Sequence, residues 1–434
     1  MTTHVIGGGL AGITAALRLA DGGRQVVLHE AKPRLGGLTH SFTRDLADGS
    51  NVWVDNGQHV FLRCCTAYRG LLDRLGVTDL VTLQDRLDVP VRSEKYAGVS
   101  RLRRSGLPAP LHLGAALATY RWLSAVERAR IVPAALAIGR VDRNDPATDE
   151  VSFGAWLTRH GQSPRAIEAL WDLIGVATLN ATADDASLAL AATVFQLGLL
   201  EANDAADIGW SRVPLQQLHG DAAAKALADA GVDVRLGSKV AGLDSLDDAD
   251  VVVLAVPPAE AERLAPTLIP VGTAEALGSS PIINLHLVYD RPVLEEPFVA
   301  GVDSPLQWVF DRTAHAGLSE GQYVAVSLSA ADVLVDQPVA ELRERLLPHV
   351  EALLPAARGA RLRDFFVTRE RHATFRPAPG AGRFRPGPRT SDERIYLAGA
   401  WTATGWPATM EGACRSGDAA AAALLEHASL MGVA

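Results

Sequence analysis

HVIGGGLAG, residues 4–12, is the stretch of sequence that decides the fold. A short apolar run ends at a cluster of glycines, and residues 10–21 then place apolar side chains on one helical face before Gly22 and Gly23 stop the helix. The next apolar strand is QVVLHE, residues 25–30. A strand, a glycine turn, a helix and a second strand in direct succession predict a βαβ unit.

The glycines form a G-x-G-x-x-G turn in which each glycine meets a different steric requirement. Gly7 permits the tight turn, Gly9 lets the backbone approach a pyrophosphate, and Gly12 lets the helix pack closely on the sheet. The free N–H groups at the helix start, around Leu10 and Ala11, attract an anionic diphosphate. The pattern therefore predicts a dinucleotide site, whereas an isolated glycine turn would be an ordinary loop.

Glu30 lies at the end of the second strand. A carboxylate at this position accepts hydrogen bonds from ribose hydroxyls and disfavours a 2′-phosphate. The alternative is a plain glycine turn beside a surface glutamate, which the strand–turn–helix context makes improbable. Ala31 follows Glu30. Gly36 and Gly37 are a second glycine pair, preceded by Arg34, and we expect these residues to add contacts to the phosphate and ribityl region of the cofactor.

A second strand-to-helix transition closes the chain, in LAGAWTATGWPATMEGACRSG, residues 397–417. Glycine at such a point again lets the backbone approach a ligand. The residues that we expect at the cofactor are Gly399, Ala400, Trp406, Met410 and Glu411. Glu411 is equally compatible with a simple helix cap.

Between the two ends, the pattern alternates between α/β and helical segments. Strands are expected at VDVRLG (232–237), KVAGL (239–243, with Val240 at the cofactor) and DVVVLAV (250–256). Several helices are expected over 151–200, and strands over 281–330. The predicted fold class is α/β: a discontinuous Rossmann-like cofactor domain (1–60, 213–275 and 385–434) with an inserted α+β substrate domain (61–212 and 276–384).

Composition narrows the classes of partner. A chain of 434 residues is longer than one hydrophobic core usually supports. Its net charge of -9 without a basic block argues against nucleic acid as a partner. The three cysteines show no metal-ligand spacing, so we expect no metal and a reduced, cytoplasmic protein. From the first residues we expect no signal peptide, and without a long uncharged apolar run we expect no transmembrane helix.

The DNGQH block, residues 55–59, is the candidate catalytic segment because it places polar groups between apolar stretches. Such groups either satisfy structural hydrogen bonds or face a substrate. For His59 alone, a structural histidine is the better interpretation.

Together, GGGLAG with RLGG, DNGQH, ATLNATADDAS (177–187) and the 397–417 segment resemble the flavin amine oxidase and phytoene desaturase superfamily, and within it the FAD-dependent hydroxysqualene dehydroxylases. The resemblance covers most of the chain. It implies a glutathione-reductase-type domain with non-covalent FAD, and reductive removal of the hydroxyl of hydroxysqualene to give squalene. His59 is then the candidate proton donor, with Gln58 and Asp55 orienting it.

One departure concerns Ala400, where the resemblance leads us to expect an aspartate that helps hold the ribityl-phosphate end of the flavin. A single dinucleotide fingerprint implies an external electron donor. An apolar isoprenoid substrate implies peripheral contact with the inner face of a membrane. Residues 108–139 are expected to be largely apolar and helical, and with Arg101, Arg103 and Arg104 before them they are a candidate surface. The alternative is an ordinary buried helix with a solvated charged lead-in. The alternatives are a carotenoid desaturase, an amine oxidase, or a non-catalytic prenyl-lipid binder on the same scaffold.

Overall fold

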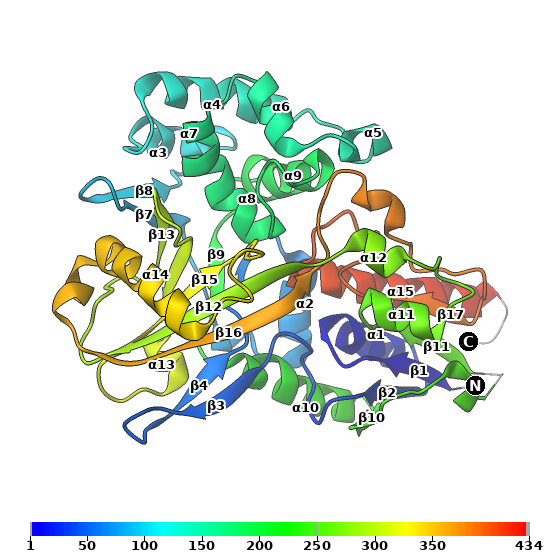
Figure 1. Ribbon diagram of the computed structural model, residues 1–434. Helices are drawn as coiled ribbons and strands as arrows, with labels where there is room; N and C mark the ends of the chain where they lie inside the picture. The colour runs from blue at the N-terminus through cyan, green and yellow to red at the C-terminus, as the bar shows by residue number, and fades with distance from the viewer. Residues whose placement is uncertain (1, 248–249, 431–434) are drawn as a thin grey trace.

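The computed structural model describes residues 2–247 and 250–430, which form two large sheets, two small sheets and a layer of helices (Figure 1). The first sheet is parallel throughout and is assembled from three distant parts of the chain. Its strands, in spatial order, are β10 (Asp233–Leu236), β2 (Val26–Glu30), β1 (Thr3–Ile6), β11 (Val251–Leu254) and β17 (Ile395–Leu397). The expected Rossmann-like α/β fold is confirmed.

Both faces of this sheet are covered, as its uninterrupted apolar strands require. Val5, Leu28 and Val253 share a core with the helices α1 (Leu10–Asp21), α2 (Thr66–Leu75), α10 (Ala222–Asp229) and α15 (Met410–Leu430). Ile6 and Leu254 face the opposite side, where α11 (Pro258–Leu264) packs. The strand expected at KVAGL (239–243) is wrong, because those residues form an irregular loop that follows β10.

The second sheet has seven mixed strands and lies beside the first (Figure 1). In spatial order they are β16 (Leu362–Thr374), β12 (Ser280–Tyr289), β15 (Gln322–Leu328), β14 (Trp308–Asp311), β13 (Phe298–Val302), β7 (Asp88–Ser93) and β8 (Val99–Arg103). Alternate β12 residues pack against α14 (Val339–Leu353), which contains Pro348 within its length. The opposite face of β12 carries the buried polar residues Asn284 and His286.

Helices form a layer over the other side of this sheet, at the top of Figure 1. They are α3 (Gly114–Ala118), α4 (Ala125–Ile138), α5 (Pro146–Asp149), α6 (Phe153–Arg159), α7 (Pro164–Ala166), α8 (Asp172–Leu179) and α9 (Leu188–Phe195). The expectation of helix over 108–139 is only partly met, since residues 119–124 separate α3 from α4. Within the described residues, no helix is both long and apolar enough to cross a membrane.

Asn180, in the ATLNATADDAS stretch, ties this helical layer to the seven-stranded sheet. It ends α8 with a positive φ of 57°, and its amide nitrogen donates to Ser280 O and Thr374 Oγ1, both at 2.9 Å. Its amide oxygen accepts from Ala330 N at 2.7 Å. The whole side-chain amide is therefore used for anchoring, and this explains the motif structurally.

Two small sheets complete the fold. β3 (Ser41–Asp45) pairs with β4 (Asn51–Asp55), and β9 (Ile208–Ser211) lies between β5 (Val60–Leu62) and β6 (Val81–Leu83). The DNGQH block begins in the last residue of β4. It lies against the polar face of β12, because Asn284 Nδ2 reaches Asn56 O at 3.4 Å, and beside the start of β3, because Asn56 N donates to His40 O at 2.9 Å.

Candidate active site

The glycine turn lies at the carboxyl edge of the parallel sheet, where ligands bind in open α/β sheets. Gly7 has a φ of +111°, and a Cβ there would lie 2.3 Å from Ala255 O. A Cβ on Gly12 would lie 1.9 Å from Gly7 O. Only glycine permits this approach of α1 to the ends of β1 and β11, as the sequence indicated.

The second glycine pair packs directly on the first. Gly36 N donates to Gly8 O at 2.9 Å, and a Cβ on Gly37 would lie 2.9 Å from Gly9 Cα. The helix α1 begins after Gly9 with neither a side-chain cap nor an acidic residue in its first turn. Its first N–H groups, around Leu10 and Ala11, are therefore available to an anion, so these residues fit a diphosphate.

Glu30 is held at this cradle, with 9% of its surface exposed. Its carboxylate accepts from Gly8 N at 2.6 Å and from Lys32 N at 2.7 Å, so it faces the glycine turn. Arg34 donates to Gly37 O at 2.9 Å, and burial lowers the pKa of its guanidinium. Ala31 is exposed beside them.

Val240 lies on the same side of the sheet, although not on the expected strand. Gly237 N donates to Lys32 O at 3.0 Å and Ser238 N to Glu30 O at 2.9 Å, so the loop after β10 follows the end of β2. Val240 is buried two residues later. This places it on the Glu30 side of the cradle.

The last strand supplies the other wall of the crevice. Gly399 has a φ of +137°, and its N–H donates to Ser416 Oγ at 2.8 Å. Trp401 is buried and donates from Nε1 to Val256 O at 2.9 Å. The ring of Trp401 is thus part of the core that joins β11 to β17. Ala400 and Trp406 are half-buried in the loop that continues from it.

Glu411 differs from its expected role. Met410 begins α15, but the Glu411 carboxylate accepts from Ala67 N at 3.2 Å and Tyr68 N at 2.8 Å, and from Arg415 Nε at 2.6 Å. It therefore caps the neighbouring helix α2 rather than its own helix, and it is almost fully buried there. Any contact of Glu411 with the cofactor falls to its backbone.

The predicted orientation of His59 by Asp55 and Gln58 is not met. Asp55 forms a buried ion pair with Arg312, and accepts from Ser41 Oγ at 2.6 Å and Leu215 N at 3.1 Å. Gln58 Oε1 is buried without a hydrogen-bond partner among the described residues. A buried carboxylate takes the strongest donor that the fold offers, and Arg312, which lies between β14 and α13 (Thr313–Ala316), takes the place of the neighbouring histidine.

His59 itself is half-buried between these groups. Burial lowers its pKa to about 4, with the charges of Arg312 and His40 acting in the same direction and that of Asp55 opposing them. The imidazole is therefore neutral at pH 7. As a proton donor it would act through a neutral N–H group.

A buried pair under the second glycine turn is not predicted by any sequence pattern. Tyr68 Oη and His219 Nε2 are 2.8 Å apart, and His219 Nδ1 lies 3.3 Å from Thr39 O. Burial lowers the pKa of His219 to about 3 and raises that of Tyr68. No local pattern signals this pair, because its members come from α2 and from the turn before α10.

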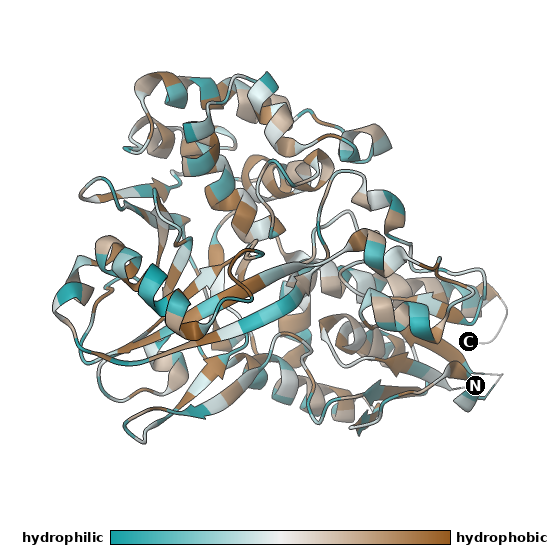
Figure 2. Cartoon of the chain, viewed as in Figure 1, coloured by the Kyte–Doolittle hydropathy of each residue, from teal (hydrophilic) through white to brown (hydrophobic). Residues whose placement is uncertain are grey.

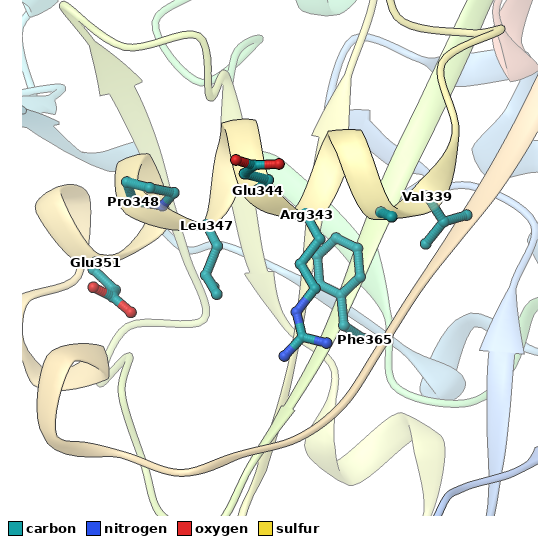
Figure 3. Close-up of a pocket in the computed structure, with 8 residues that line it drawn as sticks. Val339, Arg343, Glu344, Leu347, Pro348, Glu351 and Phe365 are labelled. Atoms are coloured by element: carbon teal, nitrogen blue, oxygen red, sulfur yellow. The ribbon is translucent and has the colours of Figure 1, made fainter.

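A surface groove along α14 lies apart from this crevice (Figure 3). Arg343 extends over the ring of Phe365 there, 6.0 Å from its centroid. The groove is on the face of the seven-stranded sheet that α14 covers, away from the glycine cradle (Figure 1). Among the described residues, no group of three potential ligands could hold a metal ion.

Comparison with known proteins defines the class. The model of the flavin-containing amine oxidoreductase family matches residues 10–425. The chain belongs to this family, and it is an FAD-dependent oxidoreductase. Both the cofactor and the enzyme class predicted from the sequence are confirmed.

Individual relatives narrow the comparison. Hydroxysqualene dehydroxylase of Rhodopseudomonas palustris is 30% identical over 97% of each chain, and that of Sinorhizobium fredii is 28% identical over 96% of this chain and 97% of its own. Zeta-carotene desaturase of Synechocystis is 24% identical over 98% of each. Cyclohexylamine oxidase of Brevibacterium oxydans shares the fold, with a TM-score of 0.71 and 20% identity over 99% of each chain.

Proposed function

We propose that the enzyme removes the hydroxyl group of hydroxysqualene reductively and releases squalene. The observation that carries the proposal is the match over nearly the whole chain to relatives named hydroxysqualene dehydroxylase. The glycine cradle adds physical support, because a flavin held there supplies hydride chemistry at an apolar carbon.

The reaction balances with one hydride and one proton. A C–O bond at the allylic carbon breaks and a C–H bond forms, while the departing hydroxyl takes the proton and leaves as water. Reduced FAD, when bound, supplies the hydride. The protein must bind the apolar substrate, exclude water from the developing cation, and deliver the proton.

We assign the proton delivery to His59, which follows β4 and feels the charges of the buried Asp55–Arg312 pair. Its neutral imidazole suits a site that also accommodates a developing cation, since a charged imidazolium would repel that cation. Asp55 contributes through its charge rather than by contact, because its carboxylate is bound to Arg312.

Residues from both ends of the chain would hold FAD. The diphosphate would lie against the backbone of Gly7, Gly9 and the start of α1, with ribose hydroxyls on Glu30. The flavin end would lie near Gly399, Trp406 and Met410. In the same proposal, residues 1–60, 213–275 and 385–434 form the cofactor domain and the remainder binds substrate. Electrons would come from a separate protein or a diffusible reductant.

The test is anaerobic incubation of the photoreduced enzyme with hydroxysqualene, followed by mass spectrometry of the extracted lipid. We expect loss of one oxygen, with squalene as product and reoxidation of the flavin. A His59→Ala variant that still binds FAD should lose about 100-fold in rate, the usual contribution of a positioned acid. Inertness of the wild type with hydroxysqualene would contradict the proposal.

A carotenoid desaturase is the second candidate, because desaturases also match over nearly the whole chain. Turnover of a carotene precursor by the oxidised enzyme, without turnover of hydroxysqualene, would favour it. An amine oxidase needs aromatic rings at the flavin face to position the amine. It is less supported, since the ring of Trp401, which could serve there, is fixed in the core. A preparation that neither contains nor takes up FAD would instead indicate a prenyl-lipid binder.

Delivery of a water-insoluble substrate leads us to propose peripheral membrane contact at one surface. Large apolar side chains are exposed on α4 and on the loop before α3, at the top of Figure 1, where Figure 2 shows apolar and hydrophilic segments side by side. We name this the α4 surface; it comprises Leu107, Leu111, Val126, Val132 and Leu136, which are 46–64% exposed.

The charge around the α4 surface suits anionic headgroups. Residues 101–141 contain seven arginines and a single acidic residue, Glu127, within a chain of net charge -9. The cations differ from those first expected. Arg104 is bound to buried Asp207 at 2.6 Å, and Arg101 and Arg103 both pair with Asp88.

The available cations are instead Arg121, Arg130 and Arg140. All three are exposed, and none forms an ion pair with another described residue. Arg130 lies on α4 and Arg140 lies just after it, so the two arginines flank the exposed Val132 and Leu136. An apolar stripe with flanking arginines is the arrangement that binds an anionic bilayer surface.

Vesicle flotation tests this contact. We expect the wild type to float with phosphatidylglycerol vesicles, less so with phosphatidylcholine, and to be released by salt. Val132→Asp with Leu136→Asp should abolish flotation, whereas Val271→Asp, at a position 89% exposed elsewhere, should not. Equal flotation of the double variant and the wild type would refute this surface.

A further inference from the structure

Arg385 is a buried cation in the loop before β17. Its side chain reaches across to the loop that leaves the sheet after Gly399, and only 8% of the residue is exposed. Nη2 donates to Thr402 O at 2.6 Å and to Trp406 O at 2.7 Å, and Nε donates to Trp401 O at 3.2 Å. One guanidinium therefore holds both ends of the 401–406 segment.

Among the described residues, no carboxylate forms an ion pair with this guanidinium. The ring of Phe375 lies 4.6 Å from the guanidinium carbon, and Asp149 acts on it through its charge alone, because the Asp149 carboxylate is bound to Ser187 Oγ and Gly382 N. Burial lowers the pKa of Arg385 to about 10, with the charge of Asp149 opposing this shift, so Arg385 remains charged at pH 7. Buried charges are usually paired by contact, and one held by carbonyl dipoles and a ring leaves positive potential in its surroundings.

An acidic residue at position 400, where this chain has alanine, would offset the positive charge of Arg385. The Ala400 carbonyl lies 3.4 Å from Arg385 Nη2, and its side chain is half-buried at the carboxyl edge of β17. An aspartate is expected there from the resemblance stated above. With alanine, this chain keeps the positive charge of Arg385 and has no carboxylate at position 400 to offset it.

We propose that Arg385 is a positioning residue for the flavin. Its guanidinium shapes the 400–406 loop, and because Ala400 adds no negative charge beside it, the cofactor site keeps a net positive potential that favours the reduced flavin. Reduction adds negative charge to the flavin, and a nearby fixed cation in a low-dielectric site stabilises that charge. The inference requires FAD in the crevice but not any particular substrate.

Redox titration of the purified holoenzymes against reference dyes tests it without substrate. Arg385→Gln removes the charge and should shift the flavin midpoint potential to a more negative value. Arg385→Lys keeps the charge, so its potential should stay near that of the wild type while FAD is retained less firmly. Ala400→Asp adds the carboxylate and should also shift the potential to a more negative value.

Arg389→Gln is the control, because Arg389 is exposed and pairs with Glu426 at 2.6 Å. Its potential should match that of the wild type. If Arg385→Gln fails to retain FAD, Ala400→Asp decides the matter alone. An unchanged potential in Ala400→Asp, or an equal shift in Arg385→Lys and Arg385→Gln, would overturn the proposal.

Discussion

The two turns at the carboxyl edge of the parallel sheet are built by opposite means. The turn after β1 is shaped by its own glycines, which let backbone pack on backbone at Gly9 and Gly37. The turn after β17 is held by side chains from elsewhere: Arg385 grips its carbonyls, and Thr193 of α9 donates to Gly405 O at 3.0 Å. Local sequence therefore specifies the first turn, and long-range packing specifies the second.

Gly12→Ala should break the first turn and have the largest effect. The added Cβ would meet Gly7 O at 1.9 Å, so α1 must move away from the sheet. We expect a loss of about 3 kcal/mol in the free energy of unfolding, as for severe overpacking, together with loss of bound flavin. Urea unfolding and flavin absorbance measure the two effects.

Gly70→Ala is its control, because a Cβ at this position on α2 meets nothing within 4 Å. It should stabilise the protein by about 0.5–1 kcal/mol through helix propensity. Should Gly12→Ala behave like Gly70→Ala, the close approach of α1 would not be what fixes the first turn.

Glu411→Gln tests the long-range support of the last helix. The variant removes the charge that binds two N–H groups of α2 and Arg415, and we expect a loss of about 2 kcal/mol. Glu426→Gln on the same helix breaks only the exposed pair with Arg389, which should cost less than about 0.5 kcal/mol. Similar losses in both variants would remove the distinction between a buried support and a surface pair.

Acid should destabilise the protein through His219, which lies beneath the Gly36–Gly37 turn that packs on the first turn. The pKa of His219 is about 3 in the folded protein, below its ordinary value of 6.5, so the unfolded chain binds the proton more readily. Its contribution is present above pH 6.5 and is lost as the pH falls toward 3; at pH 5 the loss is about 1–2 kcal/mol.

Urea unfolding of wild type and His219→Gln at pH 7 and pH 5 measures this contribution. The difference between the two pH values should shrink in His219→Gln. It should persist in Tyr68→Phe, which removes only the partner hydroxyl. The assignment fails if His219→Gln keeps the full difference.

Ser416→Ala should have the smallest effect and sharpens the picture of the second turn. Ser416 Oγ accepts from Gly399 N at 2.8 Å and donates to Ala413 O at 2.6 Å. Losing both hydrogen bonds should cost about 1 kcal/mol and broaden the flavin absorption bands as Gly399 gains freedom. Unchanged stability and spectrum would show that Arg385 alone suffices to hold this turn.

Sequence alone determined the β1–α1–β2 unit, the glycine cradle, Glu30 at its rim, and hence the cofactor. These features depend on neighbours within about 30 residues and on conformations that only glycine adopts, so the local pattern specifies them. It also located the final strand and helix, because their apolar periodicity is strong.

Tertiary structure alone decided which partners the polar side chains take. Asp55 binds Arg312 rather than orienting His59, Glu411 caps α2, and Arg385 holds the loop after Gly399. The first two pairings join residues that are 257 and 343 positions apart along the chain. Arg385 lies only 17 residues before Thr402, but the sequence between them carries no motif that indicates the contact. A buried charge takes whichever donor or acceptor the packed fold brings within reach, and no local pattern encodes that choice.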